Sequence, residues 1–347
     1  MTEPRAVSRS GLVTLKHGAG GRAMRQLIEE VLAAGFTDQP ADGVGLAAMD
    51  DGAALRLGDR FLVITTDSHV VQPIFFPGGD IGRLAVCGTV NDLAMMGATE
   101  PLALTAAVIL EEGFPQADLE RIHRSMLDAC REAGAPVVTG DTKVMGRGEL
   151  DGIVINTTGL ALAPAIVRDN GLQPGDQVIL TGGVADHGIA LMALRHKLEL
   201  EAELRSDVAP INAMVRAALK AARGGISAMK DPTRGGVASA LHEMAQKSGV
   251  GIVLTESAVP MSPVVRSTAE LLGLDPLQIA NEGKAIVGVR PEATDRVLAA
   301  IRSHPLGRDA AVVGQCSAEH PGRVTLDTGL GRRLLTEAEG EPLPRIC

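Results

Sequence analysis

The 347-residue chain has a formal net charge of −9, contains neither Trp nor Tyr, and carries 41 glycines. This length allows two domains with separate cores, and an acidic chain without stacking aromatics argues against nucleic acid as a partner. The cysteines form no Cys-x-x-Cys pair, which favours a reducing compartment over a disulfide framework; they are Cys87, Cys130, Cys316 and Cys347. No signal-like or membrane-spanning apolar segment is evident, so the sequence predicts a cytoplasmic protein without a membrane partner.

A glycine-rich segment, Gly18-Ala19-Gly20-Gly21, precedes an amphipathic helical run at 24–32. These features predict an N-terminal leader over residues 1–40 that contains a loop and a helix. A glycine-rich loop that opens a helix presents free backbone N–H groups to an anion. The segment matches neither the Walker pattern nor the dinucleotide fingerprint, so on its own a plain turn also explains it.

Carboxylate side chains recur beside apolar runs in the first half of the chain. Asp50 and Asp51 precede a predicted strand, and an apolar run at 61–67 ends in Asp67. A short predicted strand in the segment 137–143 ends in Gly-Asp-Thr-Lys, which contains Asp141. If these elements are neighbours, their carboxylates repel one another unless cations neutralise them, which implies a divalent metal such as Mg²⁺ together with a nucleotide phosphate. For the first pair alone, a solvated hairpin turn is the simpler interpretation.

Two further polar positions accompany these carboxylates. Asn91 and Asp92 interrupt the apolar face of a helix predicted at 82–97, and buried polar groups need partners that a metal or ligand could supply. Lys143 lies beside the predicted carboxylate rim, where its charge could face a phosphoryl group or move a proton, although an ordinary surface lysine is the alternative.

The order of predicted elements indicates an α/β protein with two domains. A strand at 102–110, a helix at 117–133 and a strand at 153–160 complete an N-terminal domain over 41–165, and a turn-rich segment at 168–176 separates it from the second. The second domain, over 172–330, contains predicted strands at 178–181 and 285–289 and a helix at 237–247. Its segments Asp231-Pro232-Thr233-Arg234-Gly235-Gly236 and Asn281-Glu282-Gly283-Lys284 fit either ligand loops or simple turns.

The last residues, Pro344-Arg345-Ile346-Cys347, place a thiol at the extreme C-terminus. Residues 336–343 lack helical or strand periodicity and are rich in Glu, so we predict a flexible, extended tail over 333–347. Fully extended, such a tail spans roughly 50 Å, enough to bring Cys347 to a pocket on this chain or on a partner. A frayed end with an incidental cysteine is the alternative interpretation of the tail alone.

Taken together and in order, these motifs resemble the aminoimidazole-ribonucleotide synthetase (PurM-like) superfamily of ATP-dependent enzymes. The resemblance extends over residues 12–347 and is closest to the HypE family of nickel-iron hydrogenase maturation factors, whose hallmark is a C-terminal Pro-Arg-Ile-Cys. It rests on Asp-Asp-Gly-Ala, Thr-Thr-Asp, Asn-Asp-Leu, Gly-Asp-Thr-Lys, Asp-Pro-Thr-Arg-Gly-Gly and Asn-Glu-Gly, each of which is unspecific alone.

The resemblance implies a homodimer in which the first domains pair strands into a barrel-like sheet, with ATP and Mg²⁺ held between the two domains. It implies that the carbamoyltransferase HypF carbamoylates Cys347, that ATP dehydrates this thiocarbamate to a thiocyanate, and that cyanide passes to iron on the HypC-HypD complex. The implied catalytic residues are Cys347, Glu282 and Lys143. The implied metal ligands are Asp50, Asp51, Asp67, Asp92 and Asp141. The implied nucleotide contacts are Gly18, Gly20, Gly21, Asp50, Asp67, Asn91, Asp92, Asp141 and Thr142.

Two other functions are compatible with parts of the sequence. Another ATP-dependent member of the superfamily, such as selenophosphate synthetase or a purine-pathway synthetase, would share the acidic motifs, but the former uses a Cys or selenocysteine near its glycine-rich loop and here no cysteine precedes Cys87. A thiol carrier or iron-binding scaffold without catalysis would need only the tail, and the predicted carboxylate rim argues against it.

Overall fold

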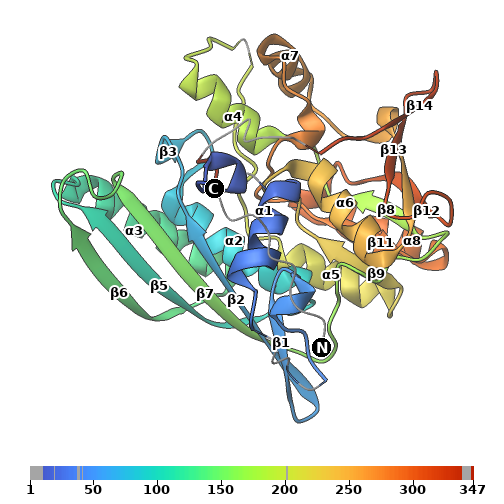
Figure 1. Cartoon of the computed structure of the whole chain (residues 1–347), viewed down its shortest axis with the longest axis horizontal. Coiled ribbons are helices and arrows are strands. Elements are labelled where there is room, and N and C mark those ends of the chain that lie inside the picture. The colour runs from blue at the N-terminus through green and yellow to red at the C-terminus, as the bar shows by residue number, and fades with distance from the viewer. Residues whose placement is uncertain (1–10, 19, 37–39, 41, 201, 338–344) are drawn as a thin grey trace.

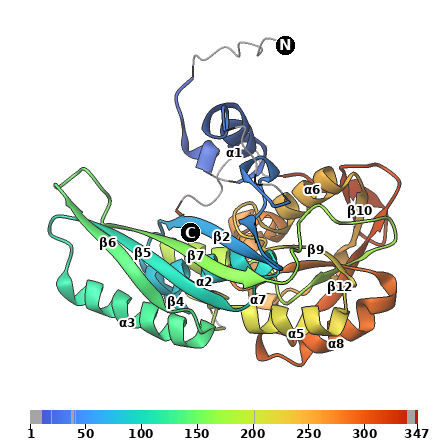
Figure 2. The same ribbon diagram turned by 90° about the horizontal axis from the view of Figure 1, so that it is seen from below.

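The computed structural model describes all residues except 1–10, 19, 37–39, 41, 201 and 338–344. Two β-sheets, each covered by helices, lie side by side, and the N-terminal helix α1 (Gly21–Leu27) lies above their junction (Figures 1 and 2). The predicted α/β architecture with two sheet-containing halves is confirmed. No helix in the described part of the chain is long and apolar enough to cross a membrane.

The first sheet has the order β1-β2-β7-β5-β6, and its strands are antiparallel except for the parallel pair β5-β6. Its strands are β1 (Ala53–Leu57), β2 (Arg60–His69), β5 (Pro101–Glu111), β6 (Val137–Met145) and β7 (Ile153–Ala163). In β7 buried residues alternate with half-buried ones, as expected when one face of a sheet packs on helices. Figure 2 shows α2 (Ile81–Met95) and α3 (Gln116–Ala133) beneath that face.

Helix α2 is the central element of the first half because it is buried along nearly its whole length. The carboxylate of Asp80 caps its N-terminus by accepting hydrogen bonds from the N–H groups of Gly82 and Arg83. Gly88 allows the helix to approach β2, since a Cβ at this position would lie 2.8 Å from Nε2 of His69. This close packing fixes the distance between the carboxylate-bearing residues of α2 and β2.

The second sheet has the order β14-β13-β10-β12-β8-β11-β9. Its strands are β8 (Gln177–Leu180), β9 (Ile226–Lys230), β10 (Gly251–Thr255), β11 (Ile286–Val289), β12 (Ala311–Ser317), β13 (Val324–Asp327) and β14 (Arg332–Leu334). Helix α6 (Gly236–Ser248) shares an apolar cluster with Val178 and Leu180, whereas α5 (Asn212–Ala222) and α8 (Thr294–Arg302) share another with Ile179. Alternate residues of β8 therefore face opposite helical layers, and this sheet is covered on both faces.

The remaining elements connect these layers. The remaining α-helices are α4 (Asp186–Arg195) and α7 (Pro263–Leu272), and a short π-helix at Ile28–Leu32 directly follows α1. Short 3₁₀ segments lie at Leu15–Gly18, Leu46–Ala48, Glu256–Ala258, Pro276–Gln278, Pro291–Ala293 and Pro305–Gly307. A two-stranded ribbon, β3 (Phe75–Phe76) with β4 (Gly79–Asp80), precedes α2.

Two details of the sequence prediction differ from the structure. The apolar run expected to end at Asp141 continues as strand β6, so Asp141 and Lys143 lie within an exposed edge strand rather than at a strand end. The tail expected to begin at Arg333 begins later, because β14 pairs with β13 and Leu335 is buried. The predicted domain boundaries and the strand pairing across a dimer stay predictions.

The end of the tail also differs from the solvated segment that was expected. Ile346 is only 3% exposed and belongs to the apolar cluster at the junction of the two halves. Much of the predicted tail, 338–344, lies outside the described residues. The C-terminus is therefore packed against the body of the protein, beside β3 and α4 (Figure 1).

Candidate functional site

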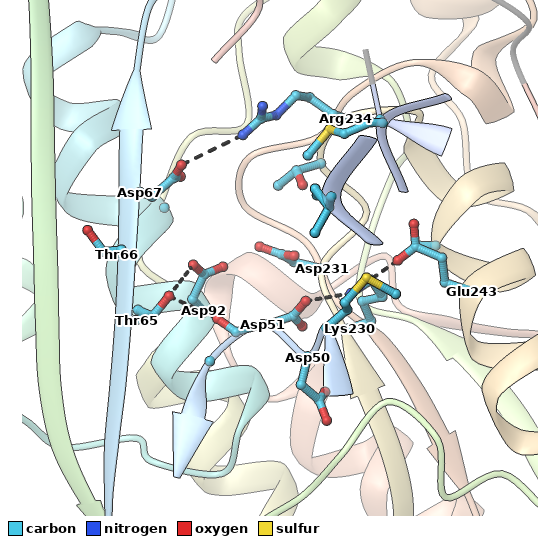
Figure 3. Close-up of a pocket in the computed structure, with 18 of the residues that line it drawn as sticks. Asp50, Asp51, Thr65, Thr66, Asp67, Asp92, Lys230, Asp231, Arg234 and Glu243 are labelled. Carbon is cyan, nitrogen blue, oxygen red and sulfur yellow. Dashed lines mark hydrogen bonds and ion pairs between the residues drawn. The ribbon is translucent and has the colours of Figure 1, made fainter. Parts of the chain in front are cut away.

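A cavity of about 630 Å³ is lined by residues of both halves of the chain. The N-terminal segment contributes Gly20 and Gly21, and the terminal residue Cys347 also lines it. The charged side chains around it are Arg25, Asp50, Asp51, Asp67, Asp92, Lys230, Asp231, Arg234, Glu243, Lys247 and Glu282. Figure 3 shows that the labelled carboxylates from β2, α2 and the loop after β9 face a common space. A volume of this size is typical of a small-molecule site.

Three carboxylates of this cavity repel one another. Burial, followed by repulsion from Asp231 and other carboxylates, raises the pKa of Asp92 well above its usual range. Burial, with repulsion from Asp51 adding to it, raises the pKa of Asp231 to about 8. Oδ2 of Asp51 has no hydrogen-bond partner in the described part of the chain. The cavity therefore holds more negative charge than its own cations balance, which is the condition that favours binding of a further cation.

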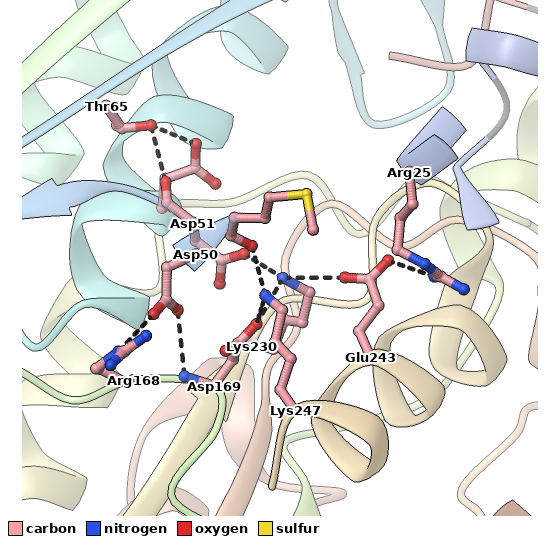
Figure 4. Close-up of polar contacts among 11 residues, drawn as sticks. Arg25, Asp50, Asp51, Thr65, Arg168, Asp169, Lys230, Glu243 and Lys247 are labelled. Atoms are coloured by element: carbon pink, nitrogen blue, oxygen red, sulfur yellow. Dashed lines mark hydrogen bonds and ion pairs between the residues drawn. The ribbon is translucent and has the colours of Figure 1, made fainter. Parts of the chain in front are cut away.

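Lys230, the last residue of β9, is the central cation of the site. Its Nζ lies 2.5 Å from Oδ1 of Asp51, 3.5 Å from Oε2 of Glu243 and 3.6 Å from Oδ2 of Asp169 (Figure 4). Burial would lower the pKa of Lys230, but these three carboxylates raise it well above its usual range. For Asp51 burial outweighs the attraction of Lys230 and raises its pKa, because one ammonium group is shared among three carboxylates.

Two basic residues complete this network of charges. Nζ of Lys247, on α6, lies 2.6 Å from Oδ2 of Asp169 and donates to the backbone oxygen of Met49 at 2.5 Å. Arg25 of α1 pairs with Glu243 at 2.9 Å, so the N-terminal helix is attached to the wall of the cavity. Burial would raise the pKa of Glu243, but Lys230 and Arg25 together lower it.

Asp50 supports the wall of the cavity, and each of its carboxylate oxygens accepts a hydrogen bond. Its Oδ2 accepts a hydrogen bond from Nε of Arg168 at 3.0 Å, and its Oδ1 accepts one from the N–H of Asp169 at 3.2 Å (Figure 4). Its side chain is 1% exposed. These contacts hold the segment between the two sheets, so in this structure Asp50 positions Asp169 and does not present a free carboxylate to a metal.

Asp67 is fixed between a histidine and an arginine. Its Oδ2 lies 3.1 Å from Nε2 of the buried His69, and its Oδ1 lies 3.7 Å from Nη2 of Arg234 (Figure 3). Burial would raise the pKa of Asp67, but His69 and Arg234 lower it. Asp67 is therefore kept ionised in the lining of the cavity, as a ligand for a cation must be.

Glu282 is a buried carboxyl group with an unsatisfied oxygen. It is 3% exposed, and its Oε1 has no hydrogen-bond partner within the described residues. Burial, followed by repulsion from Asp231 and Asp207, raises its pKa well above the usual range. Asp207 accepts hydrogen bonds from the N–H groups of Glu282 and Gly283, which fixes the backbone. The side chain is therefore free to exchange a proton with a bound group.

Asn91 holds backbone groups beside the cavity, and its predicted contact with nucleotide stays a prediction. Its Nδ2 donates to the carbonyl oxygens of Ala209 and Glu282, both at 3.1 Å, and its Oδ1 accepts from the N–H of Ile211 at 2.9 Å. It does not line the cavity. Because its polar atoms are all used by backbone groups, Asn91 positions the Glu282 loop against α2.

The structure separates four other predicted residues from the cavity. Asp141, Thr142 and Lys143 lie on β6, and Asp141 pairs with Lys143 at 2.8 Å with both side chains more than 60% exposed. Gly18 ends an exposed 3₁₀ segment, whereas Gly20 and Gly21 line the cavity. The structure thus brings Cys347 and Glu282 together but leaves Lys143 outside the cavity of the single chain.

Sequence reasoning did not assign Lys230, Asp231, Arg234 or Glu243 to the site. The sequence did contain a signal, because the short apolar strand β9 ends at Lys230 and is followed directly by Asp231 and by the glycine-rich start of α6. Among the described residues, no group of three or more His, Cys, Asp or Glu side chains is arranged to hold a metal ion in this structure. The predicted metal ligands therefore stay a prediction.

Comparison with known proteins places this chain in a family. Residues 49–163 match the N-terminal domain model, and residues 173–327 the C-terminal domain model, of AIR synthase related proteins. The chain is 48% identical to the carbamoyl dehydratase HypE of Rhizobium leguminosarum bv. viciae, over 97% of this chain and 96% of the relative.

Solved structures agree with this relationship. A HypE-HypF complex contains a chain that superimposes with a TM-score of 0.83 at 43% identity, over 90% of this chain and 99% of that one. A hydrogenase maturation protein HypE in complex with ATP gives a TM-score of 0.80 at 41% identity, over 97% of this chain and 100% of that one. The chain therefore belongs to the AIR synthase related proteins and, within them, to the HypE family of carbamoyl dehydratases.

Proposed function

We propose that this protein uses ATP to dehydrate an S-carboxamide on Cys347 to a thiocyanate, and so supplies the cyanide ligands of the nickel-iron hydrogenase iron centre. The observation that carries the proposal is that Cys347, Glu282 and the glycine pair Gly20-Gly21 line one acidic cavity. The relatives named carbamoyl dehydratase and the solved HypE with ATP support the same reaction.

The cavity has features that fit ATP with Mg²⁺. Gly20 and Gly21 open helix α1, where backbone N–H groups can face phosphate oxygens, and Arg234 adds a positive charge. The carboxylates of Asp51, Asp67 and Asp92 are hard oxygen donors of the kind that Mg²⁺ prefers, and the unpaired Oδ2 of Asp51 would gain a partner. Bound there, Mg²⁺ would neutralise charge on the phosphates during transfer.

The reaction has two stages that balance without a further reactant. The carbamoyl oxygen attacks the γ-phosphorus of ATP, ADP leaves, and one proton is lost from the carbamoyl nitrogen. The C–O bond then breaks as phosphate leaves, the second nitrogen proton is lost, and a C≡N bond is formed on the sulfur of Cys347. Each stage needs a base near the carbamoyl nitrogen.

Glu282 is the group best placed for this proton transfer. It lines the same cavity as Cys347, and a carboxyl group with a raised pKa is a stronger base once it is deprotonated. Its unpaired Oε1 leaves an oxygen available for the carbamoyl N–H. Lys143 and Asp141 remain candidates through a second copy of the chain, since they lie on the exposed edge strand β6, where a homodimer could pair strands.

The proposed partners follow from the same family. A HypE has been solved in a complex with HypF, and we propose that a HypF-type carbamoyltransferase loads Cys347 of this chain. Transfer of cyanide to iron on a HypC-HypD complex and a cytoplasmic location are parts of the same proposal. A competing function from a different class, a thiol carrier without catalysis, would consume no ATP.

The direct test compares Glu282→Gln with the wild type after carbamoylation of Cys347. We expect the variant to keep its affinity for ATP but to lose dehydration by a factor of roughly 100 or more, the usual share of a positioned acid or base. Mass spectrometry of the C-terminal peptide measures the loss of water. Glu120→Gln, an exposed glutamate on α3, is the matched control. Unchanged turnover in Glu282→Gln would remove Glu282 from the mechanism, and absence of ATP consumption by the carbamoylated wild type would refute the function.

A further inference from the structure

A second cavity lies in the half of the molecule that contains the second sheet. Its volume is about 760 Å³, and among the described residues it shares no lining residue with the acidic cavity. The turn after β8 contributes Gly182 to its lining, the start of α4 contributes Asp186, and the segment between α8 and β12 contributes Arg308. A volume of this size is typical of a small-molecule site.

The cations that line this cavity have hydrogen-bond donors to spare. Within the described part of the chain, the exposed Arg308 has no hydrogen bond or ion pair, and the exposed Arg302 donates only from Nε to the carbonyl oxygen of Ala310 at 2.8 Å. Lys284 is the third cation, and the exposed Asp309 is one of two carboxylates in the lining. Guanidinium groups with free N–H donors favour phosphate-like anions.

Asp186, the other carboxylate of this cavity, restricts which anion fits. It is half-buried, and no described residue donates a hydrogen bond to it. Burial, followed by repulsion from Asp207, raises its pKa to about 6, so at pH 8 it is ionised and accepts hydrogen bonds only. Hydrogen phosphate can donate its remaining O–H to such a carboxylate. Sulfate carries no proton at this pH, and a phosphate monoester loses its last acidic proton near pH 6.

Lys284 connects this cavity to the loop that carries Glu282. Its Nζ lies 3.3 Å from Oδ2 of Asp207, and its stem packs across Gly182, where a Cβ would lie 2.9 Å from Cε of Lys284. The side chain of Asp207 is 3% exposed and accepts hydrogen bonds from the N–H groups of Glu282 at 3.0 Å and Gly283 at 3.3 Å. One buried carboxylate therefore holds both the cation of the second cavity and the backbone of a residue that lines the first.

We propose that the second cavity binds inorganic phosphate between its guanidinium groups and Asp186, and that phosphate bound there slows dehydration. The bound anion attracts Lys284, which leaves the buried Asp207 without its cation and alters its hold on the backbone of Glu282. Lys284 and Asp207 are positioning residues in this account. The slowing rests on the proposed function, in which phosphate is a product, whereas the binding does not.

The first test measures binding without turnover. Isothermal titration calorimetry at pH 8 follows the addition of phosphate to the full chain, while a non-hydrolysable ATP analogue with Mg²⁺ saturates the acidic cavity. Phosphate should bind at least roughly tenfold more tightly than sulfate or methyl phosphate, because these two ions leave Asp186 without a donor. Equal affinity for the three ions, or no measurable binding of phosphate, would overturn the site.

Two variants locate the bound ion. Arg308→Met should weaken phosphate binding by roughly tenfold, the usual effect of losing one charge-assisted hydrogen bond. Arg131→Met, an exposed arginine on α3, is the matched control and should leave the affinity unchanged. Asp186→Asn should bring the affinities for sulfate and phosphate to within about threefold, because an amide N–H can donate to either ion. Wild-type affinity in Arg308→Met, or an undiminished preference for phosphate in Asp186→Asn, would refute the assignment.

The second test measures the effect on dehydration. In the carbamoylated protein, phosphate should lower the maximal rate of water loss by roughly fivefold or more and leave the half-saturating ATP concentration unchanged. The ratio of the rates with and without phosphate should lie closer to one in Arg308→Met than in Arg131→Met. A raised half-saturating ATP concentration with an unchanged maximal rate would place the effect in the ATP cavity and overturn the coupling. A carbamoylated wild type that consumes no ATP would refute the proposed function and leave the phosphate site to the first test.

Discussion

The substitution Lys230→Met tests whether one buried cation holds the acidic cavity together. Methionine keeps an unbranched side chain of similar length but removes the charge that Asp51, Glu243 and Asp169 share at 2.5, 3.5 and 3.6 Å. Asp169 is fully buried and would keep only Lys247, while Asp51 would lose its sole ion-pair partner among the described residues. The variant should therefore carry uncompensated buried negative charge in its folded state.

The magnitude follows from the burial of these partners. Removal of one member of a buried ion pair costs about 3–5 kcal/mol, because the remaining charge is desolvated without compensation. Lys247 and Arg25 neutralise part of the charge that remains, which favours the lower end of this range. For a chain of 347 residues, with an unfolding entropy of about 2.1 cal/mol/K per residue, the loss corresponds to a fall in Tm of roughly 4–7 °C.

Differential scanning calorimetry of the protein without nucleotide measures this effect. Lys220→Met, an exposed lysine on α5, is the matched control and should change the free energy of unfolding by less than about 0.5 kcal/mol. Adding Asp51→Asn to Lys230→Met should restore part of the lost stability, since the pair is then removed together. This role of Lys230 would be refuted if Lys230→Met were as stable as the control. It would also be refuted if the losses in the free energy of unfolding caused by Lys230→Met and Asp51→Asn simply added in the double variant.

Two further predictions concern the binding of ATP. Gly20→Ala should weaken ATP binding by roughly tenfold in calorimetric titration, because overpacking costs about 1–3 kcal/mol and the new Cβ would lie 2.7 Å from the carbonyl oxygen of Arg234. Gly35 also has a positive φ, but a Cβ at this position would meet no atom within 4 Å. An equal loss of ATP affinity in Gly35→Ala would therefore show that backbone strain, and not the contact with Arg234, is responsible. Asp92→Asn relieves repulsion with Asp231, so Tm without ligand should stay the same or rise, while the stabilisation by ATP with Mg²⁺ falls. A lower Tm without ligand, or an unchanged response to ATP with Mg²⁺, would contradict this reading of Asp92.

The choice among possible cation ligands depends on contacts that motifs do not encode. Asp50 and Asp51 are adjacent in the Asp-Asp-Gly-Ala motif, yet both oxygens of Asp50 accept hydrogen bonds, from Arg168 and from the backbone of Asp169, while Asp51 keeps an unpaired oxygen. Asn91 and Asp92 are likewise adjacent, and only Asp92 lines the cavity. Neighbouring residues of a strand or helix point in different directions, so their roles depend on what packs against each face.

The sequence by itself determined the family, the α/β class and the chemistry, because these depend on local motifs and on a terminal Pro-Arg-Ile-Cys that can be read without a structure. Only the tertiary structure decided that Lys230 is the centre of the acidic cavity, since two of its three partners, Asp51 and Asp169, come from distant parts of the chain. The same holds for the exposed position of Lys143 and for the docking of Ile346 and Cys347 between β3 and α4. The contacts of Lys230 with Asp51 and Asp169, and those of Ile346, join residues far apart in the chain and form only when both sheets are packed together.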